Sequence, residues 1–203
     1  MPAAQTVAQA RGRKRLQTHE QLQSIALRAV QREGYSQATV ERIAAEAGIS
    51  LRTFYRYFPT KEAVILYDPL DLSLHEAILA MPRNISPIEA IRLASQSMYQ
   101  SLSETQHELL DLRHKLIVKN PELRMHLIAQ LAEAAPLIAA AVAQRLQKSS
   151  NSPEIEILAS SIIGVVVVTL AAVARVEEYS LDGYQMRLYA ELEKLEKYST
   201  GHN

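Results

Sequence analysis

A short stretch of the chain, residues 49–58, brings together side chains that can hydrogen-bond to a polar or anionic partner. Phe54 and Phe58 are one helical turn apart, and we expect them to pack inward with Ile43. That packing leaves the other side chains on or near the outer surface: Leu51, Arg52, Thr53, Tyr55 and Tyr57. A narrow helix surface of small, polar and basic groups fits a DNA major groove, which is about 12 Å wide.

The six histidines offer a different chemistry, metal binding or acid–base catalysis. No His-Glu-x-x-His motif, Ser/His/Asp set or glycine-rich phosphate loop accompanies them. His107 and His114 are seven residues apart with Asp111 between them, a spacing that lets one helix face present ligands to a metal ion. Partly buried, hydrogen-bonded side chains explain the same spacing better. We therefore expect no enzyme, no metal site and no cofactor.

Helices must position these side chains. Apolar residues recur at three-and-four spacing along the chain and strand-like alternation is almost absent, which predicts an all-α fold of about nine helices. In the N-terminal part, Gly34, Gly48 and Pro59 are expected to end successive helices. The helices expected there are 18–33, 40–47, 51–57 and 61–79.

Stronger start signals lie further along the chain. A capping residue followed by proline and an acid occurs three times, at Ser86-Pro87, Asn120-Pro121 and Ser152-Pro153. Glu89 is also placed to reach back toward Ser86 and complete a capping box. The helices expected here are 87–103, 104–118, 121–148, 153–178 and 184–197.

Composition narrows the class of protein. With 203 residues, 48% of them hydrophobic, the chain can bury a substantial core. The absence of cysteine excludes disulfides and thiolate metal sites. The first ten residues lack the apolar core of a signal peptide, so we expect a cytoplasmic protein, which would be nucleoid-associated if it binds DNA.

The helices 40–47 and 51–57, joined by a glycine turn, have helix-turn-helix spacing. Helical hairpins of this kind also occur in proteins that do not bind DNA. Charge adds support, because residues 1–61 carry ten Lys or Arg against four Glu, a net +6 on a chain of zero net charge. A basic end suggests a polyanionic partner, and a merely solvated basic surface is the alternative.

The segment TVERIAAEAGISLRTFYRYFPTKE, residues 39–62, resembles the DNA-binding signature of the tetracycline-repressor (TetR/AcrR) family. The likeness extends over residues 18–66. It implies a helix-turn-helix DNA-binding domain over residues 18–62, with the motif at 40–59, and a helical effector-binding and dimerisation domain over residues 63–203. Residues 1–17 precede it as a flexible basic arm. Residues 58–70 are similar to the subgroup of the mycofactocin regulator, which implies fatty acyl-type ligands.

The same resemblance assigns roles in DNA binding. It places Arg52 and Thr53 on base edges and Leu51 near a thymine methyl group. Positions that hold phosphates in the family are occupied here by Thr39, Tyr55, Tyr57 and Lys61. Glu41 stands where some members have a base-reading arginine, so we expect no base readout from that helix. The arm residues 11–15 either follow the DNA backbone or a minor groove, or remain a solvated terminus.

The run 157–174 has no charged residue and reaches the length of a membrane span. Serine, glycine and threonine dilute it, however, and charged residues crowd both ends. The resemblance implies a four-helix bundle with a second copy of the chain, which would cover such a helix on several sides. We expect a homodimer through residues 153–197 and no membrane partner.

The resemblance also implies an effector cavity in the C-terminal part. Its candidate lining residues are Met98, Tyr99, Arg113, His114, Leu131 and Thr169. The richness of residues 87–178 in Leu, Ile, Ala and Met favours a small apolar or amphipathic ligand. If Arg113 faces inward, it can hold a carboxylate or phosphate head group; if it faces solvent, the interior is solid core.

The expected function is a sequence-specific, DNA-binding transcriptional regulator. We expect a repressor that a small, mostly apolar effector releases from a palindromic operator. A helical dimeric carrier of small molecules, without DNA readout, is the alternative, and an acid–base enzyme is a more remote one. Salt-dependent retention on DNA separates the first from the second.

Overall fold

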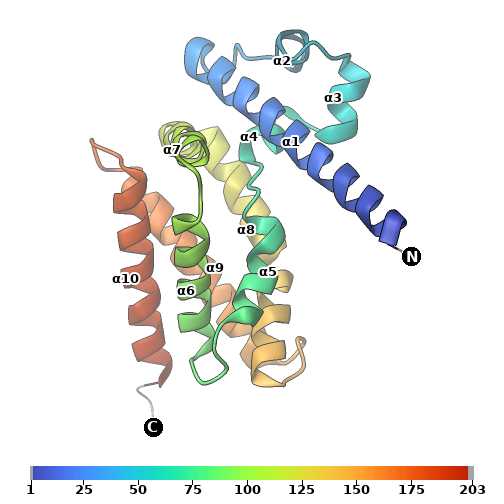
Figure 1. Cartoon of the computed structure of the whole chain (residues 1–203). Coiled ribbons are helices and arrows are strands. Elements are labelled where there is room, and N and C mark those ends of the chain that lie inside the picture. Colours follow the sequence, from blue (N-terminus) through green and yellow to red (C-terminus); the bar gives the residue numbers. More distant parts are fainter. Residues whose placement is uncertain (1, 201–203) are drawn as a thin grey trace. The chain divides into compact units, whose positions relative to one another are not determined.

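The computed structural model describes the backbone of residues 2–200 and the side chains of residues 18–71 and 73–199. Over residues 2–200 the protein is entirely helical, with ten helices and no strand (Figure 1). The helices are α1 (Pro2–Glu33), α2 (Val40–Glu46), α3 (Leu51–Tyr57), α4 (Lys61–Leu66), α5 (Asp71–Ala80), α6 (Pro87–Gln100), α7 (Glu104–Lys119), α8 (Pro121–Leu146), α9 (Pro153–Val173) and α10 (Leu181–Thr200). The all-α prediction is confirmed.

The chain divides into two compact units at the Pro69–Leu70 bond. This division explains the additional helix, because the single helix expected over residues 61–79 is two, α4 and α5. Pro69 lies between them and disfavours helical backbone at the preceding residue. α4 therefore belongs with the first unit.

α1 starts much earlier than the residue 18 predicted for it. It begins at Pro2, so the segment expected as a flexible arm is part of this helix. Residues 3–17 contain no further proline and are rich in Ala, Gln and Arg, which favour helical backbone. The side chains of this segment lie outside the described residues.

In the first unit, α1, α2, α3 and α4 pack around a small apolar core. Its largest fully buried side chains are Phe54, Leu27, Ile43, Ile65 and Val64. Two glycines close the helix ends around it: Gly34 has φ +84° and Gly48 has φ +66°, a left-handed backbone that other residues rarely adopt. The predicted turn between α2 and α3 is thus formed by Gly48.

In the second unit, α5, α6, α8, α9 and α10 lie side by side, and α7 lies across one end of them, seen nearly end-on in Figure 1. A core cluster joins the bundle at the other end, with Ile78 from α5, Ile91 from α6, Val142 from α8, Ile162 from α9 and Leu192 from α10. These helices therefore share one continuous core.

Arg145, near the end of α8, fastens this helix to the α5–α6 connection. Its Nη1 donates to the carbonyl oxygens of Ile78 (3.1 Å) and Met81 (3.0 Å). Its Nη2 donates to those of Pro82 (2.6 Å) and Ile85 (3.2 Å). One guanidinium thus donates to four backbone carbonyl oxygens at the connection, of which that of Ile78 also accepts from Met81 N (3.3 Å).

The cap signals in the sequence predict where the helices start, but they predict the hydrogen bonds at those starts less well. α6, α8 and α9 each have proline in the first turn, as expected. Ser86 Oγ accepts from Glu89 N (3.0 Å), but the Glu89 carboxylate pairs with Arg92 instead of reaching back. Ser152 makes no side-chain cap bond. A full capping box stands at Ser103, at the start of α7.

Two helices, α8 and α9, are long and apolar enough to cross a membrane by length and composition alone. Core helices of soluble proteins meet the same criterion, so this is weak support for a membrane protein. Both helices carry exposed apolar side chains: Met125, Leu137, Leu146, Ile157 and Val168.

Candidate nucleic-acid interface and effector site

The second short helix of the first unit, α3, has a buried side and an exposed side. Phe54 is 0% exposed and Phe58, which follows α3, is 4% exposed, so the aromatic pair anchors the helix as predicted. On the outer side, Leu51 is 40% exposed and Tyr55 is 50% exposed. Arg52 is exposed as well. The outer side of α3 therefore presents aliphatic, guanidinium and phenol groups to solvent.

Three hydroxyls cap the helices of this unit. Thr39 Oγ1 accepts from Arg42 N (3.4 Å), Ser50 Oγ accepts from Thr53 N (3.2 Å), and Thr60 Oγ1 accepts from Ala63 N (3.0 Å). These bonds satisfy amides that a helix start leaves open. The hydroxyls of Ser50 and Thr53 also lie 3.0 Å apart. Thr53 is half-buried, and its hydroxyl is thus oriented by the cap.

Tyr57 is half-buried rather than fully on the outer surface. Its ring meets His19 of α1 edge-on at 5.2 Å between centroids, and the Arg56 guanidinium lies 5.2 Å from the Tyr57 ring centroid. His19 also packs on Phe58 (5.0 Å) and stacks on Tyr67 (5.3 Å). This aromatic cluster ties the end of α3 to α1.

Lys61 is held within the first unit. Its Nζ donates to the Tyr35 carbonyl oxygen (2.8 Å) and lies 3.9 Å from the centroid of the Tyr35 ring. The Tyr35 hydroxyl in turn donates to Glu62. An ammonium group has three donors, so a carbonyl bond leaves room for a phosphate contact from the same nitrogen.

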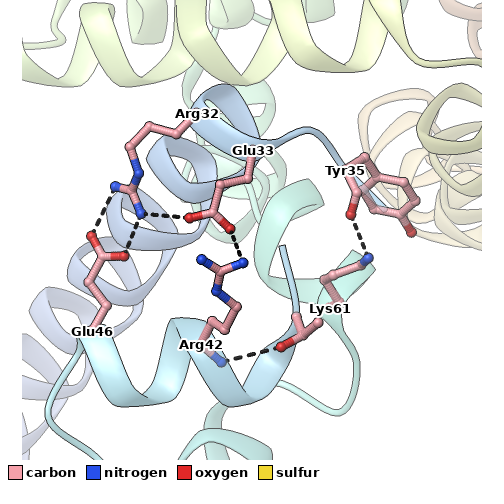
Figure 2. A network of polar contacts seen from close by, with 7 residues as sticks. Arg32, Glu33, Tyr35, Arg42, Glu46 and Lys61 are labelled. Carbon is pink, nitrogen blue, oxygen red and sulfur yellow. Dashed lines mark hydrogen bonds and ion pairs between the residues drawn. The ribbon is translucent and has the colours of Figure 1, made fainter. Parts of the chain in front are cut away.

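An ion-pair network joins the last turn of α1 to α2 (Figure 2). Arg32 donates to both carboxylate oxygens of Glu46 (3.2 and 2.8 Å) and to Glu33 (3.3 Å). Arg42 reaches the other oxygen of Glu33 at 2.9 Å. The hydrogen bond from Arg32 lowers the pKa of Glu46. Sequence reasoning missed this network, since the hydrogen bonds from Arg32 to Glu46 join residues 14 apart, on two different helices.

The predicted effector residues lie in the second unit and differ in exposure. Arg113 is 5% exposed and Thr169 is 0% exposed. Half-buried positions are taken by the others, Met98, Tyr99, His114 and Leu131. The inward-facing alternative for Arg113 therefore agrees with its burial in the single chain.

Two tyrosines that the sequence reasoning did not select, Tyr179 and Tyr184, lie near these residues. The His114 and Tyr184 rings are 5.0 Å apart, and the Tyr99 hydroxyl donates to Asp182 (2.9 Å). Burial, followed by the Asp182 hydrogen bond, raises the pKa of Tyr99 to about 12. Burial also raises the pKa of Tyr179 well above its ordinary value, with Tyr184 and Arg113 among its neighbours. α7, α10 and the end of α6 thus form one polar, phenol-rich region.

His107 and His114, both on α7, are not arranged as ligands of a metal site. The His107 ring lies edge-on to Tyr99, with 4.5 Å between centroids, and Asp111 pairs with Lys115 at 2.5 Å. Among the side chains that the structure describes, no group of three or more His, Asp or Glu is arranged to hold a metal ion.

Family models match both units. One described as "Bacterial regulatory proteins, tetR family" matches residues 24–67, and one described as "MftR C-terminal domain" matches residues 85–196. The chain is 26% identical over 175 residues to the mycofactocin biosynthesis transcriptional regulator MftR of Mycobacterium tuberculosis, covering 84% of this chain and 86% of that protein. It is 38% identical over 82 residues to the HTH-type transcriptional regulator EthR of Mycolicibacterium smegmatis, spanning only 37% of that relative's length.

Solved structures show the same fold. FadR of Thermus thermophilus, a TetR-family transcriptional repressor in complex with lauroyl-CoA, superposes with a TM-score of 0.53 at 21% identity, covering 91% of this chain and 95% of FadR. A TetR-family regulator from Mesorhizobium loti gives a TM-score of 0.50 at 19% identity, covering 89% of this chain and 95% of the other.

Proposed function

The chain belongs to the tetR family of bacterial regulatory proteins, which are DNA-binding transcriptional regulators, and on this premise we propose that it is a dimeric repressor released from a palindromic operator by a small, mostly apolar effector. The observation that carries the proposal is α3, whose outer side presents Leu51, Arg52 and Tyr55 above the buried Phe54. A helix with that outer side can enter a major groove.

On the DNA side, we assign base reading to the start of α3. Arg52 can form a bidentate pair with guanine, while Leu51 contacts a thymine methyl group and Thr53 a base edge. Phosphate contacts fall to Thr39, Tyr55, Tyr57 and Lys61, which set the register of the helix without reading sequence. The exposure of Tyr55 and the remaining donors of Lys61 support these roles.

On the effector side, we assign the ligand to the second unit, with Arg113 and His114 at its polar end and Met98, Tyr99, Leu131 and Thr169 as further lining. The burial of Arg113 supports a role in holding an anionic head group, because a buried guanidinium forms strong paired bonds with a carboxylate or phosphate. FadR, which shares the fold, was solved with lauroyl-CoA, an apolar chain on an anionic carrier.

Dimerisation is the third part of the proposal, through residues 153–197. Ile157 and Val168 of α9 are 67% and 65% exposed in the single chain, and Met186 of α10 is 68% exposed. Apolar side chains gathered on two adjacent helices favour a protein partner as their cover. A second copy would place two recognition helices at half-sites one DNA turn apart.

Effector binding would act by population shift. α4 belongs to the first unit and α5 to the second, so the segment Tyr67–Leu70 is the covalent route between them. An effector that binds one conformation of the second unit better than another shifts the equilibrium toward it. Release follows if the favoured conformation holds the two recognition helices out of register with successive major grooves. The protein would work in the cytoplasm, on the nucleoid.

The test of the DNA part is retention of the purified chain on operator and random duplexes as salt is raised, with the operator taken from a genome-wide binding footprint. A regulator shows steep salt dependence and a preferred sequence. No retention on DNA, together with ligand binding, would favour the alternative of a helical carrier.

The test of the effector part is thermal unfolding with a panel of fatty acids, acyl thioesters, sugars and amines. A ligand that binds the folded state raises the melting temperature. We expect stabilisation by amphipathic acids and its loss in Arg113→Ala. Stabilisation that is unchanged in Arg113→Ala would remove the head-group role of this residue.

A further inference from the structure

The two arginines of the α1–α2 network are held by carboxylates in unequal ways (Figure 2). The Arg32 guanidinium forms a two-pronged hydrogen-bonded pair with Glu46, with distances of 3.2 and 2.8 Å. Arg42 lies 2.9 Å from Glu33 Oε2, yet this buried oxygen receives no aligned hydrogen bond within the described part of the chain. The contact of Arg42 is therefore one of charge only.

The exposure of these side chains adds to the difference. The Arg42 side chain is 60% exposed, while that of its partner Glu33 is 21% exposed. An exposed ion pair contributes little to stability, and hydrogen-bonded fork geometry adds the most to such pairs. Arg42 is thus an exposed cation beside a partly buried carboxylate, and exchanging this partner for another anion costs little free energy.

The position of Arg42 brings it next to a residue assigned to phosphate. Its backbone N–H donates to Thr39 Oγ1 (3.4 Å), so Thr39 and Arg42 share the first turn of α2. Side chains three residues apart lie on the same side of a helix. The extended side chain of Arg42 can therefore reach a phosphate that is bound near Thr39.

We propose that Arg42 is a phosphate contact of the DNA complex, and that Glu33 holds its guanidinium when no DNA is bound. Glu33 and the DNA backbone then compete for one cation. A phosphate offers the fork geometry that Glu33 does not provide, and its neutralisation releases condensed counterions from the duplex. The proposal rests on the DNA-binding function proposed above and adds an internal competitor to it.

The test uses the full chain and a mixed-sequence DNA duplex, since phosphate contacts do not depend on sequence. Binding is measured across a series of potassium chloride concentrations. Arg42→Ala is expected to reduce the slope of log Kobs against log salt by about 0.9, the value of one phosphate contact, and Arg42→Lys to keep the slope. Glu33→Gln is expected to strengthen binding up to about fivefold, since exposed pairs hold their partners weakly.

Two controls separate this role from general effects. Arg32→Ala removes the same charge from the same network and should leave the slope unchanged, because Arg32 is already forked on Glu46. Glu33→Gln should give no gain when combined with Arg42→Ala. A gain that persists without Arg42, or an equal fall of slope in Arg32→Ala, would overturn the proposal.

The failure of the inference is distinguishable from the failure of the function. If the wild-type chain shows no salt-dependent binding to any duplex, the DNA-binding function itself fails. If the wild type binds and the slope is the same in folded Arg42→Ala, only the role of Arg42 is overturned. Thermal unfolding of each variant identifies any that have lost the fold.

Discussion

At the scale of single residues, cations of the first unit stand in different surroundings, and their surroundings suggest different roles. Arg52 is exposed on the second residue of α3, where nothing in the helix pattern turns it inward. Lys61 instead lies against the carbonyl and ring of Tyr35. An exposed guanidinium on a recognition helix suits base reading, whereas an ammonium fixed on its own unit suits a sequence-independent contact.

Arg52→Ala is expected to weaken binding to the operator by about 1–3 kcal/mol and binding to random DNA by much less, because it removes the proposed base contact. Lys61→Ala should weaken both kinds of binding alike. Competition titrations with operator and random duplexes at one salt concentration measure the two effects. Equal losses on both duplexes for Arg52→Ala would contradict its assignment as a base reader.

Tyr99 should make folding stability depend on alkaline pH. Burial and the Asp182 bond raise its pKa from 10.0 to about 12 in the folded chain, so between these values the unfolded chain loses a proton that the folded chain keeps. The stabilisation is complete below pH 10 and is lost as the pH rises through 12. The advantage of the wild type over Tyr99→Phe in urea denaturation should therefore shrink across this range.

The comparison needs a matched control. Tyr198→Phe, at a side chain that is 75% exposed, should show no such narrowing. A difference between wild type and Tyr99→Phe that stays constant up to pH 12 would mean that Tyr99 titrates alike in both states.

At the scale of helices, local signals in the sequence predict starts and ends well. Proline at the first turn of α6, α8 and α9 fixes a backbone angle that suits a helix start, whatever the rest of the chain does. Gly48 is equally local, because only its own left-handed backbone is needed to end α2. For this reason the helix-turn-helix could be predicted almost residue by residue.

Interactions between helices could not be predicted in this way. The Arg32–Glu46 pair joins residues 14 apart, and the Tyr99–Asp182 bond joins residues 83 apart. Neither sequence separation corresponds to a helical or strand repeat that could be recognised in the sequence. Even within one helical turn, the Glu89 carboxylate can accept either from the Ser86 backbone N–H or from Arg92, and in the structure it pairs with Arg92. The candidate base readers were therefore identified from sequence, while the carboxylates around Arg42 and the tyrosines around Arg113 required the structure.

The connection between α5 and α6 should depend on Arg145. In Arg145→Met the aliphatic stem remains, but four carbonyl oxygens lose the hydrogen bond from the guanidinium, and we expect the free energy of unfolding to fall by about 1–3 kcal/mol. Chemical denaturation measures the loss. Arg83→Met, which changes an exposed arginine in the same connection, is the control and should have little effect. Equal stability of the two variants would show that water replaces the guanidinium without loss.

At the scale of the whole molecule, the second unit has more exposed apolar surface than a single copy needs. Val168 and Ile157 stand out on α9, although this helix also supplies Ile162 and Leu170 to the interior. A helix that is apolar on both sides is expected to be covered on its outer side by another protein surface. The same property explains why α9 meets the length and composition of a membrane span.

Val168→Glu is expected to convert the proposed dimer to monomers, because a carboxylate buried in an apolar interface has no partner. Sedimentation at micromolar concentration distinguishes the two states. Ser97→Glu adds the same charge to an exposed position on α6, outside residues 153–197, and should leave the dimer intact. A wild-type chain that sediments as a monomer at this concentration would contradict the dimer itself.

The division of the chain at the Pro69–Leu70 bond bears on how such proteins diversify. Each side has its own core, and separate family models cover residues 24–67 and 85–196. Units with separate cores tolerate mutation independently, because substitutions without shared contacts have additive effects. Under the proposed function, gene recombination at this bond would therefore exchange the operator that a descendant recognises while preserving the effector to which it responds.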